Sequence, residues 1–140
     1  MGYRYLEHTA DVMIEAHGRT IGEAFAYAAK AMFDVMFDVS KVDPKRSVKI
    51  EVEAMDSQGL LYSWLEELLF RFGVERTAFS KFKFSINTMN RVLKGTGEAQ
   101  GETYDPDKHG RKIEVKAITY AEMLITESVN GCRVKFLLDI

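Results

Sequence analysis

The residues of this 140-residue sequence that could do chemistry together are acidic, and they lie near opposite ends of the chain. The sequence ends in Asp139 and Ile140, so a side-chain carboxylate and the terminal carboxylate are one residue apart. Two anionic groups this close repel each other unless water or a cation lies between them. Together with Asp11 they would form a set of oxygen donors that suits Ca²⁺, Mg²⁺ or Mn²⁺. Spacing alone leaves a solvated, frayed chain end as the alternative.

Further polar residues gather at two other places in the sequence. His8 precedes Asp11, and a second loop holds Glu102, Asp105 and His109. A small metal-dependent hydrolase could use His8 or His109 as its general base. That interpretation requires turnover by the isolated protein, and we expect none.

Lys116 lies in a stretch of alternating apolar and polar residues that predicts a strand. Alternation places Val115 and Ala117 on one face of that strand and Lys116 on the other. The lysine is then either on the solvated face of a half-buried sheet or a positioned charge at a functional surface.

Other common catalytic patterns are absent from the sequence. The glycine-rich stretch 95–101 does not open a helix, which a phosphate-binding loop requires, so we interpret it as a strand whose glycines lie where chains crowd. The single cysteine, Cys132, can form no internal disulfide and has no convincing activating base nearby. Acidic residues prevail before residue 38 and basic residues between 76 and 112, which indicates either solvated surfaces or a partner surface of complementary charge.

Two amphipathic helices would position these residues. Thr20 with Glu23 forms a capping box, and the apolar spacing behind it predicts a helix over about 20–37. A second helix is predicted from Asp56 or Ser57 to a stop at Gly73.

The rest of the sequence predicts strands. Residues 1–18 read as two short strands, 48–54 as a strand with one wet face, and the second half of the chain as several more, with a hairpin turn at Asn130-Gly131. We therefore predict a single α+β domain over residues 1–140, with two amphipathic helices packed on a mostly antiparallel sheet.

Composition limits the function classes. The net charge of −2 excludes a global field that recruits nucleic acid, so any tRNA contact would be indirect or weak. No run of apolar residues approaches the roughly 20 that a membrane helix needs. We expect a soluble, cytoplasmic protein without membrane contact.

Several separate blocks of the sequence together resemble the archease family, in the family's order and over essentially the whole chain. The blocks are His8-Thr9-Ala10-Asp11-Val12, Leu60-Leu61-Tyr62-Ser63-Trp64-Leu65 after Asp56, Gly101-Glu102-Thr103-Tyr104-Asp105-Pro106-Asp107-Lys108-His109, Glu114-Val115-Lys116-Ala117-Ile118-Thr119-Tyr120 and Asp139-Ile140. Met13 and Ala121 depart from the family pattern, which has Gly and often His at these positions.

The resemblance implies a protein cofactor and no catalysis by the chain itself. Proteins of this family work in tRNA splicing with the RtcB-type RNA-splicing ligase, promoting its guanylylation and multiple turnover. The resemblance implies that Asp11, Asp139 and Ile140 hold a divalent ion, with calcium expected and magnesium or manganese as alternatives. It also implies a functional role for Lys116, a supporting role for His8, and a family loop of unassigned role at Glu102, Asp105 and His109.

A second function class stays open at this point. The chain could be a chaperone or specificity modulator of RNA-processing enzymes such as an RNA methyltransferase. Protection of such an enzyme from aggregation, or altered RNA methylation, that survives the loss of Asp11 and Asp139 would favour that alternative.

Overall fold

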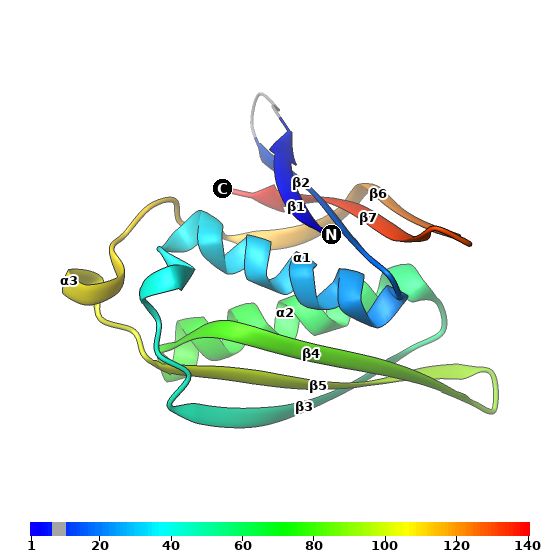
Figure 1. The fold of residues 1–140 in the computed structure, drawn as a ribbon, viewed down its shortest axis with the longest axis horizontal. Helices are drawn as coiled ribbons and strands as arrows, with labels where there is room; N and C mark the ends of the chain where they lie inside the picture. The colour runs from blue at the N-terminus through cyan, green and yellow to red at the C-terminus, as the bar shows by residue number, and fades with distance from the viewer. Residues whose placement is uncertain (7–10) are drawn as a thin grey trace.

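The chain folds into two antiparallel sheets with two long helices between them (Figure 1). The computed structural model describes residues 1–6 and 11–140. The strands are β1 (Gly2–Leu6), β2 (Asp11–Gly18), β3 (Arg46–Ala54), β4 (Thr77–Met89), β5 (Val92–Thr103), β6 (Ala117–Ser128) and β7 (Gly131–Asp139). The helices are α1 (Ile21–Met36), the 3-10 helix η1 (Val39–Lys41), α2 (Ser57–Glu75) and the one-turn α3 (Pro106–His109).

The strands divide into two sheets. One sheet has the order β1-β2-β7-β6 and the other β3-β5-β4. Helix α1 packs on β2 and β4, and α2 packs on β6 and β3, so each helix contacts both sheets. The predicted α+β class with antiparallel strands is confirmed. Alternation in a sequence shows which face of a strand is buried but not which strands pair, so the division into two sheets was not predictable in this way.

Aromatic side chains join the layers at the centre of the core. The ring of Phe33 on α1 lies 6.0 Å from that of Phe72 on α2 and 5.8 Å from that of Phe79 on β4, measured between centroids. Both contacts are edge-on, the geometry that aromatic pairs favour. The two helices and the three-stranded sheet therefore share one set of packed rings.

The glycines of β5 allow aromatic rings to lie against its backbone. A Cβ atom at Gly95 would overlap the ring of Phe84, and one at Gly97 would overlap the ring of Trp64. Trp64 is fully buried, and its indole N–H donates a hydrogen bond to the backbone oxygen of Phe25 at 3.0 Å. The prediction of a strand with glycine at crowded positions is confirmed, and a phosphate-binding loop is excluded.

The helix starts agree with the sequence, but one helix end does not. Thr20 and Asp56 each accept a hydrogen bond from the backbone N–H three residues on and so cap α1 and α2. The predicted stop of α2 at Gly73 is wrong, because the helix continues to Glu75. It ends at Arg76, whose φ of 56° is the left-handed conformation usually taken by glycine.

The strand predicted to contain Val115, Lys116 and Ala117 begins later than expected, at Ala117. Backbone N–H groups of Lys112 and Ile113 donate to the carbonyl oxygens of Met36 and Val35, at 2.9 and 3.1 Å. The start of the segment is thus held by the last turn of α1. The segment reaches β7 only at Lys116, whose N–H donates to the carbonyl oxygen of Asp139, and β6 begins at Ala117. Within the described residues, no helix is long and apolar enough to cross a lipid bilayer.

Candidate functional site

Asp11 and Asp139 lie side by side where the two central strands of the four-stranded sheet, β2 and β7, begin and end. Asp11 begins β2 and Asp139 ends β7, and the antiparallel register places the two residues directly opposite each other. Residues so paired have Cα atoms about 4.5–5.5 Å apart and side chains on the same face. Ala117, at the start of β6, is the partner of Asp139 on its other side. The two acidic residues from opposite ends of the sequence therefore meet in space.

The chain end beside them is anchored to the fold. The side chain of Ile140 is partly buried and packs against the hydrophobic core. The backbone N–H of Lys116 donates to the carbonyl oxygen of Asp139 at 2.7 Å. We call Asp11, Asp139 and Ile140 the carboxylate edge. Its last two residues do not extend freely into solvent, and Lys116 lies directly beside them.

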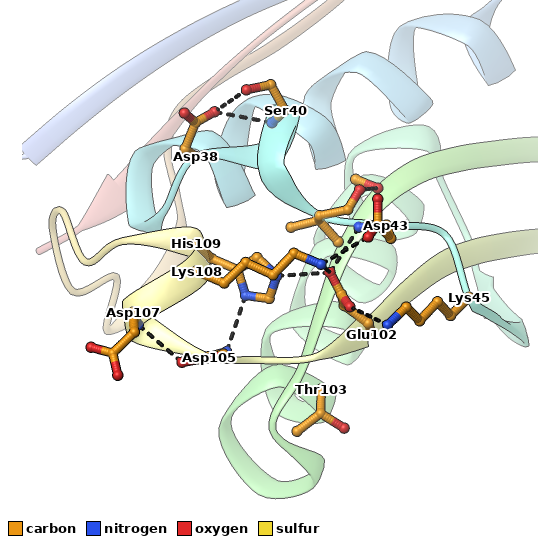
Figure 2. Close-up of polar contacts among 12 residues, drawn as sticks. Asp38, Ser40, Asp43, Lys45, Glu102, Thr103, Asp105, Asp107, Lys108 and His109 are labelled. Atoms are coloured by element: carbon orange, nitrogen blue, oxygen red, sulfur yellow. Dashed lines mark hydrogen bonds and ion pairs between the residues drawn. The ribbon is translucent and has the colours of Figure 1, made fainter.

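Glu102 lies elsewhere, at the end of β5, and is the centre of a separate polar cluster (Figure 2). Its Oε2 accepts hydrogen bonds from Lys108 Nζ at 2.7 Å, from the backbone N–H of Asp43 at 2.8 Å and from His109 Nε2 at 2.9 Å. Lys45 Nζ lies 3.4 Å from the other carboxylate oxygen. The hydrogen bond from Lys108, followed by those from Asp43 and His109, holds the pKa of Glu102 well below its ordinary value.

His109 is completely buried, and both of its ring nitrogens are engaged. Nδ1 accepts a hydrogen bond from the backbone N–H of Asp105 at 3.0 Å, so the ring proton must be on Nε2, which donates to Glu102. The rings of Phe37 and Tyr104 pack beside the imidazole, with centroids 6.2 and 5.9 Å from it and 5.5 Å from each other. A neutral, buried and fully bonded histidine has no free nitrogen to act as a general base.

Asp105 has a local structural task. Its carboxylate accepts from the backbone N–H of Asp107 at 3.0 Å and caps the one-turn helix α3. Glu102, Asp105 and His109 therefore shape and anchor α3, and Glu102 lies in β5 of the other sheet from the carboxylate edge. His8 lies outside the described residues.

Comparison with known proteins decides the family. The sequence model of the Archease protein family matches residues 3–140. The chain belongs to the archease family. A protein named "Protein archease" from Sulfurisphaera tokodaii is 44% identical over 138 residues, which cover 99% of this chain and 98% of the relative. Another with that name from Pyrococcus furiosus is 44% identical over 129 residues, covering 92% and 91%.

A solved structure agrees with the fold. The solution structure of Methanobacterium thermoautotrophicum protein 1598 superposes with a TM-score of 0.88 at 38% identity and covers 99% of both chains. The resemblance read from the sequence blocks is thus confirmed. Membership of the archease family supports a role as a protein cofactor in RNA processing.

The donor set of this archease-family chain fits a hard divalent ion held with water. The carboxylate edge offers two side-chain carboxylates on one face, and both supply oxygen donors. Within residues 1–6 and 11–140, no three His, Cys, Asp or Glu side chains gather closely enough to form a metal cage. Ca²⁺ and Mg²⁺ accept water among their ligands, so two or three carboxylates can suffice where Zn²⁺ would need a closed shell.

The structure also forms a groove beside the carboxylate edge, which was not predicted from the sequence. The groove has a volume of about 720 Å³ and lies between the second half of α2 and residues 111–118. The groove could not be predicted because its two walls were not: α2 was expected to stop at Gly73, and the segment before Ala117 was expected to be a strand. The signal that could have shown it is Phe70, an aromatic residue that lies off the apolar stripe of α2 and is 58% exposed.

Proposed function

We propose that this archease-family protein activates an RtcB-type RNA-splicing ligase in tRNA splicing and performs no catalysis itself. It would promote the ligase's guanylylation and multiple turnover in the cytoplasm, with tRNA contacted indirectly or weakly. Family membership supports the role of a protein cofactor in RNA processing. The pairing of Asp11 with Asp139 supports the proposed action on the ligase.

In this proposal the carboxylate edge holds a divalent ion, with Ca²⁺ expected and Mg²⁺ or Mn²⁺ as alternatives. Asp11 and Asp139 would supply side-chain oxygens and Ile140 the terminal carboxylate. A bound divalent ion stabilises negative charge that develops on phosphate oxygens. The hydrogen bond between the Lys116 N–H and the Asp139 carbonyl would fix the end of β7 in position. The ammonium group of Lys116 could then contact the ligase or its nucleotide.

One observation carries the proposal. Asp11 and Asp139 are direct cross-strand partners, so two like charges face each other where the sheet ends. A cation bound between the two carboxylates would interact favourably with both of them, which gives the pairing a functional reason.

The activity test uses ligase guanylylation. The protein at substoichiometric amounts should raise the rate at which GMP from GTP is attached to the ligase. Asp139→Asn and Asp11→Asn should each abolish most of that increase while leaving thermal unfolding cooperative. Glu53→Gln, which removes an exposed carboxylate from β3, is the matched control and should activate normally.

The outcome also separates the proposed function from its alternative. Normal activation by both Asp variants would contradict the role of the carboxylate edge. Altered RNA methylation, or protection of an RNA methyltransferase from aggregation, that persisted in those variants would favour the chaperone role instead.

Ion binding can be measured without the ligase. Titration with Mn²⁺ should broaden NMR signals of residues around the carboxylate edge, including Ala117, and leave those near Glu102 sharp. Asp139→Asn should weaken this broadening at equal Mn²⁺. Uniform broadening across the molecule would indicate non-specific binding and contradict the site.

A further inference from the structure

The groove beside the carboxylate edge has walls of different chemistry. Its α2 wall exposes Phe70 and Val74, which are 58% and 64% accessible. Its opposite wall is the segment 111–116, and Met36 and Leu69 are among the apolar residues that also line it. Large apolar side chains that stay exposed next to one another usually mark an interaction surface.

The opposite wall is basic. Arg111, Lys112 and Lys116 come from one short segment, which has Glu114 as its only acid. Lys112 is engaged locally, since its Nζ lies 3.0 Å from the carbonyl oxygen of Asp34. Within the described residues, Arg111 and Lys116 make no ion pair with an acidic side chain. Two cations are thus available to a partner.

The groove leads to the carboxylate edge. Lys116 and Ala117 line it, and these two residues make the backbone contacts to Asp139 described above. A chain segment lying in the groove would therefore have one end beside Asp139. A surface that holds a partner there would bring the partner's reactive groups next to the candidate metal site.

We propose that this groove docks a protein segment that carries apolar side chains along one side and acidic side chains along the other. Such a segment would place its apolar residues against Phe70 and Val74 and its carboxylates near Arg111 and Lys116. The inference rests on the proposed function, because it takes the partner to be the ligase. It adds which surface binds the ligase and what the ligase must present.

The side chains of the groove favour a protein over single-stranded RNA. Bases bind on rows of open aromatic faces, whereas the groove exposes one large aromatic residue, Phe70, and its other large exposed apolar side chains, Val74 and Ile113, are aliphatic. Aliphatic contact area with a basic rim suits a peptide better than a row of bases.

Gly73 offers a way to block the groove without disturbing the fold. It lines the groove on α2, and a Cβ atom added there would meet no other atom within 4 Å. Gly73→Trp should fill part of the groove, and Gly73→Ala, which adds one methyl group, is its matched control. Both variants should unfold cooperatively at or above the stability of the unaltered protein.

The measurement is the concentration of this protein that gives half-maximal ligase guanylylation. Gly73→Trp should raise that concentration about tenfold or more and leave the maximum unchanged, because docking is weakened and the carboxylate edge is intact. Gly73→Ala should change it little. Asp139→Asn should instead lower the maximum, because it alters the carboxylate edge and leaves the groove intact.

A charge variant gives a second, independent measurement. Arg111→Glu should raise the half-maximal concentration, and the increase should shrink with added salt as the electrostatic contribution is screened. Lys94→Glu, an exposed lysine on β5 away from the groove, is its control and should behave like the unaltered protein.

The outcomes distinguish the two proposals. If the unaltered protein does not stimulate the ligase, the proposed function fails and the docking inference fails with it. If stimulation occurs but Gly73→Trp and Arg111→Glu leave the half-maximal concentration unchanged, only the docking inference is overturned. Binding of a short fluorescent single-stranded RNA that Gly73→Trp abolishes would also overturn it, in favour of a nucleic-acid groove.

Discussion

At the scale of single residues, the Glu102 carboxylate shows how a cluster of charges can be structural. Its oxygens accept hydrogen bonds from two side chains and one backbone N–H, and these bonds join α3 to the residues that precede β3 (Figure 2). No buried polar side-chain atom of the described residues lacks a hydrogen-bond partner. A cluster that is fully satisfied within the protein has little capacity left for a ligand.

The low pKa of Glu102 makes stability depend on acid. Its bonds favour the ionised form, so its contribution to the free energy of unfolding is fully present above the ordinary pKa of 4.5 and is lost as pH falls below that value. We expect Glu102→Gln to be destabilised at neutral pH and to lose less stability on acidification. Denaturant unfolding at several pH values gives the number of protons taken up on unfolding, from the slope of the free energy of unfolding against pH. In Glu102→Gln this number should be smaller than in the unaltered protein by up to about one proton per molecule.

A control defines what would contradict this expectation. Glu53→Gln removes an exposed carboxylate and should retain the acid dependence of the unaltered protein. If the free energy of unfolding of Glu102→Gln fell as steeply with decreasing pH as that of the unaltered protein, other carboxylates would be the cause of the loss of stability. Ligase activation by Glu102→Gln should remain normal wherever the variant is folded.

At the scale of elements, the last turn of α2 is less stable than it could be. Gly73 lies in the last turn with open space around the position of its missing Cβ. Gly73→Ala should therefore raise the free energy of unfolding by roughly 0.5 kcal/mol, since glycine loses more backbone entropy than alanine in a helix. Gly59→Ala is the contrast, because a Cβ there would lie 3.0 Å from the capping Asp56 Oδ1. Gly59→Ala should not raise the free energy of unfolding, which denaturant unfolding measures. An equal increase at both positions would show that the space around the added Cβ atom does not decide the effect.

The same elements show what the sequence can and cannot predict. Helix starts were predictable because capping is local, as at Thr20 and Asp56. The end of α2 was not, because Arg76 takes the left-handed conformation and its guanidinium lies 5.7 Å from the centre of the Tyr104 ring, a contact between residues distant in sequence. Ile113 and Val115 alternate like a strand, yet their segment packs on the end of α1.

The candidate site divides in the same way. The proximity of Asp11 to Asp139 depends on the pairing of β2 with β7, which alternation does not specify. The residue types alone left it as one of two alternatives, and the family resemblance then favoured it. For Glu102 and His109 the sequence showed polar residues close together but not their burial. Burial and mutual hydrogen bonding indicate that they stabilise the fold, and these properties appear only in three dimensions.

At the scale of the whole molecule, the two sheets depend on each other. Both α1 and α2 contact both sheets, so removing either sheet would expose an apolar side of each helix (Figure 1). The chain carries one tryptophan and one cysteine, and they report on different layers. Trp64 lies against β5 of one sheet, while Cys132 is buried in β7 of the other.

We therefore expect one cooperative unfolding transition in urea. Burial, with a smaller effect from Glu127, raises the pKa of the Cys132 thiol to about 11, so the folded protein should react slowly with a thiol reagent. Trp64 fluorescence and Cys132 labelling should give the same midpoint. Leu138→Ala, in β7, should cost about 2–5 kcal/mol and lower the Trp64 midpoint as much as the Cys132 midpoint, although Trp64 contacts the other sheet. Labelling of Cys132 at urea concentrations where Trp64 is still native would show that the four-stranded sheet opens alone, and with it the carboxylate edge.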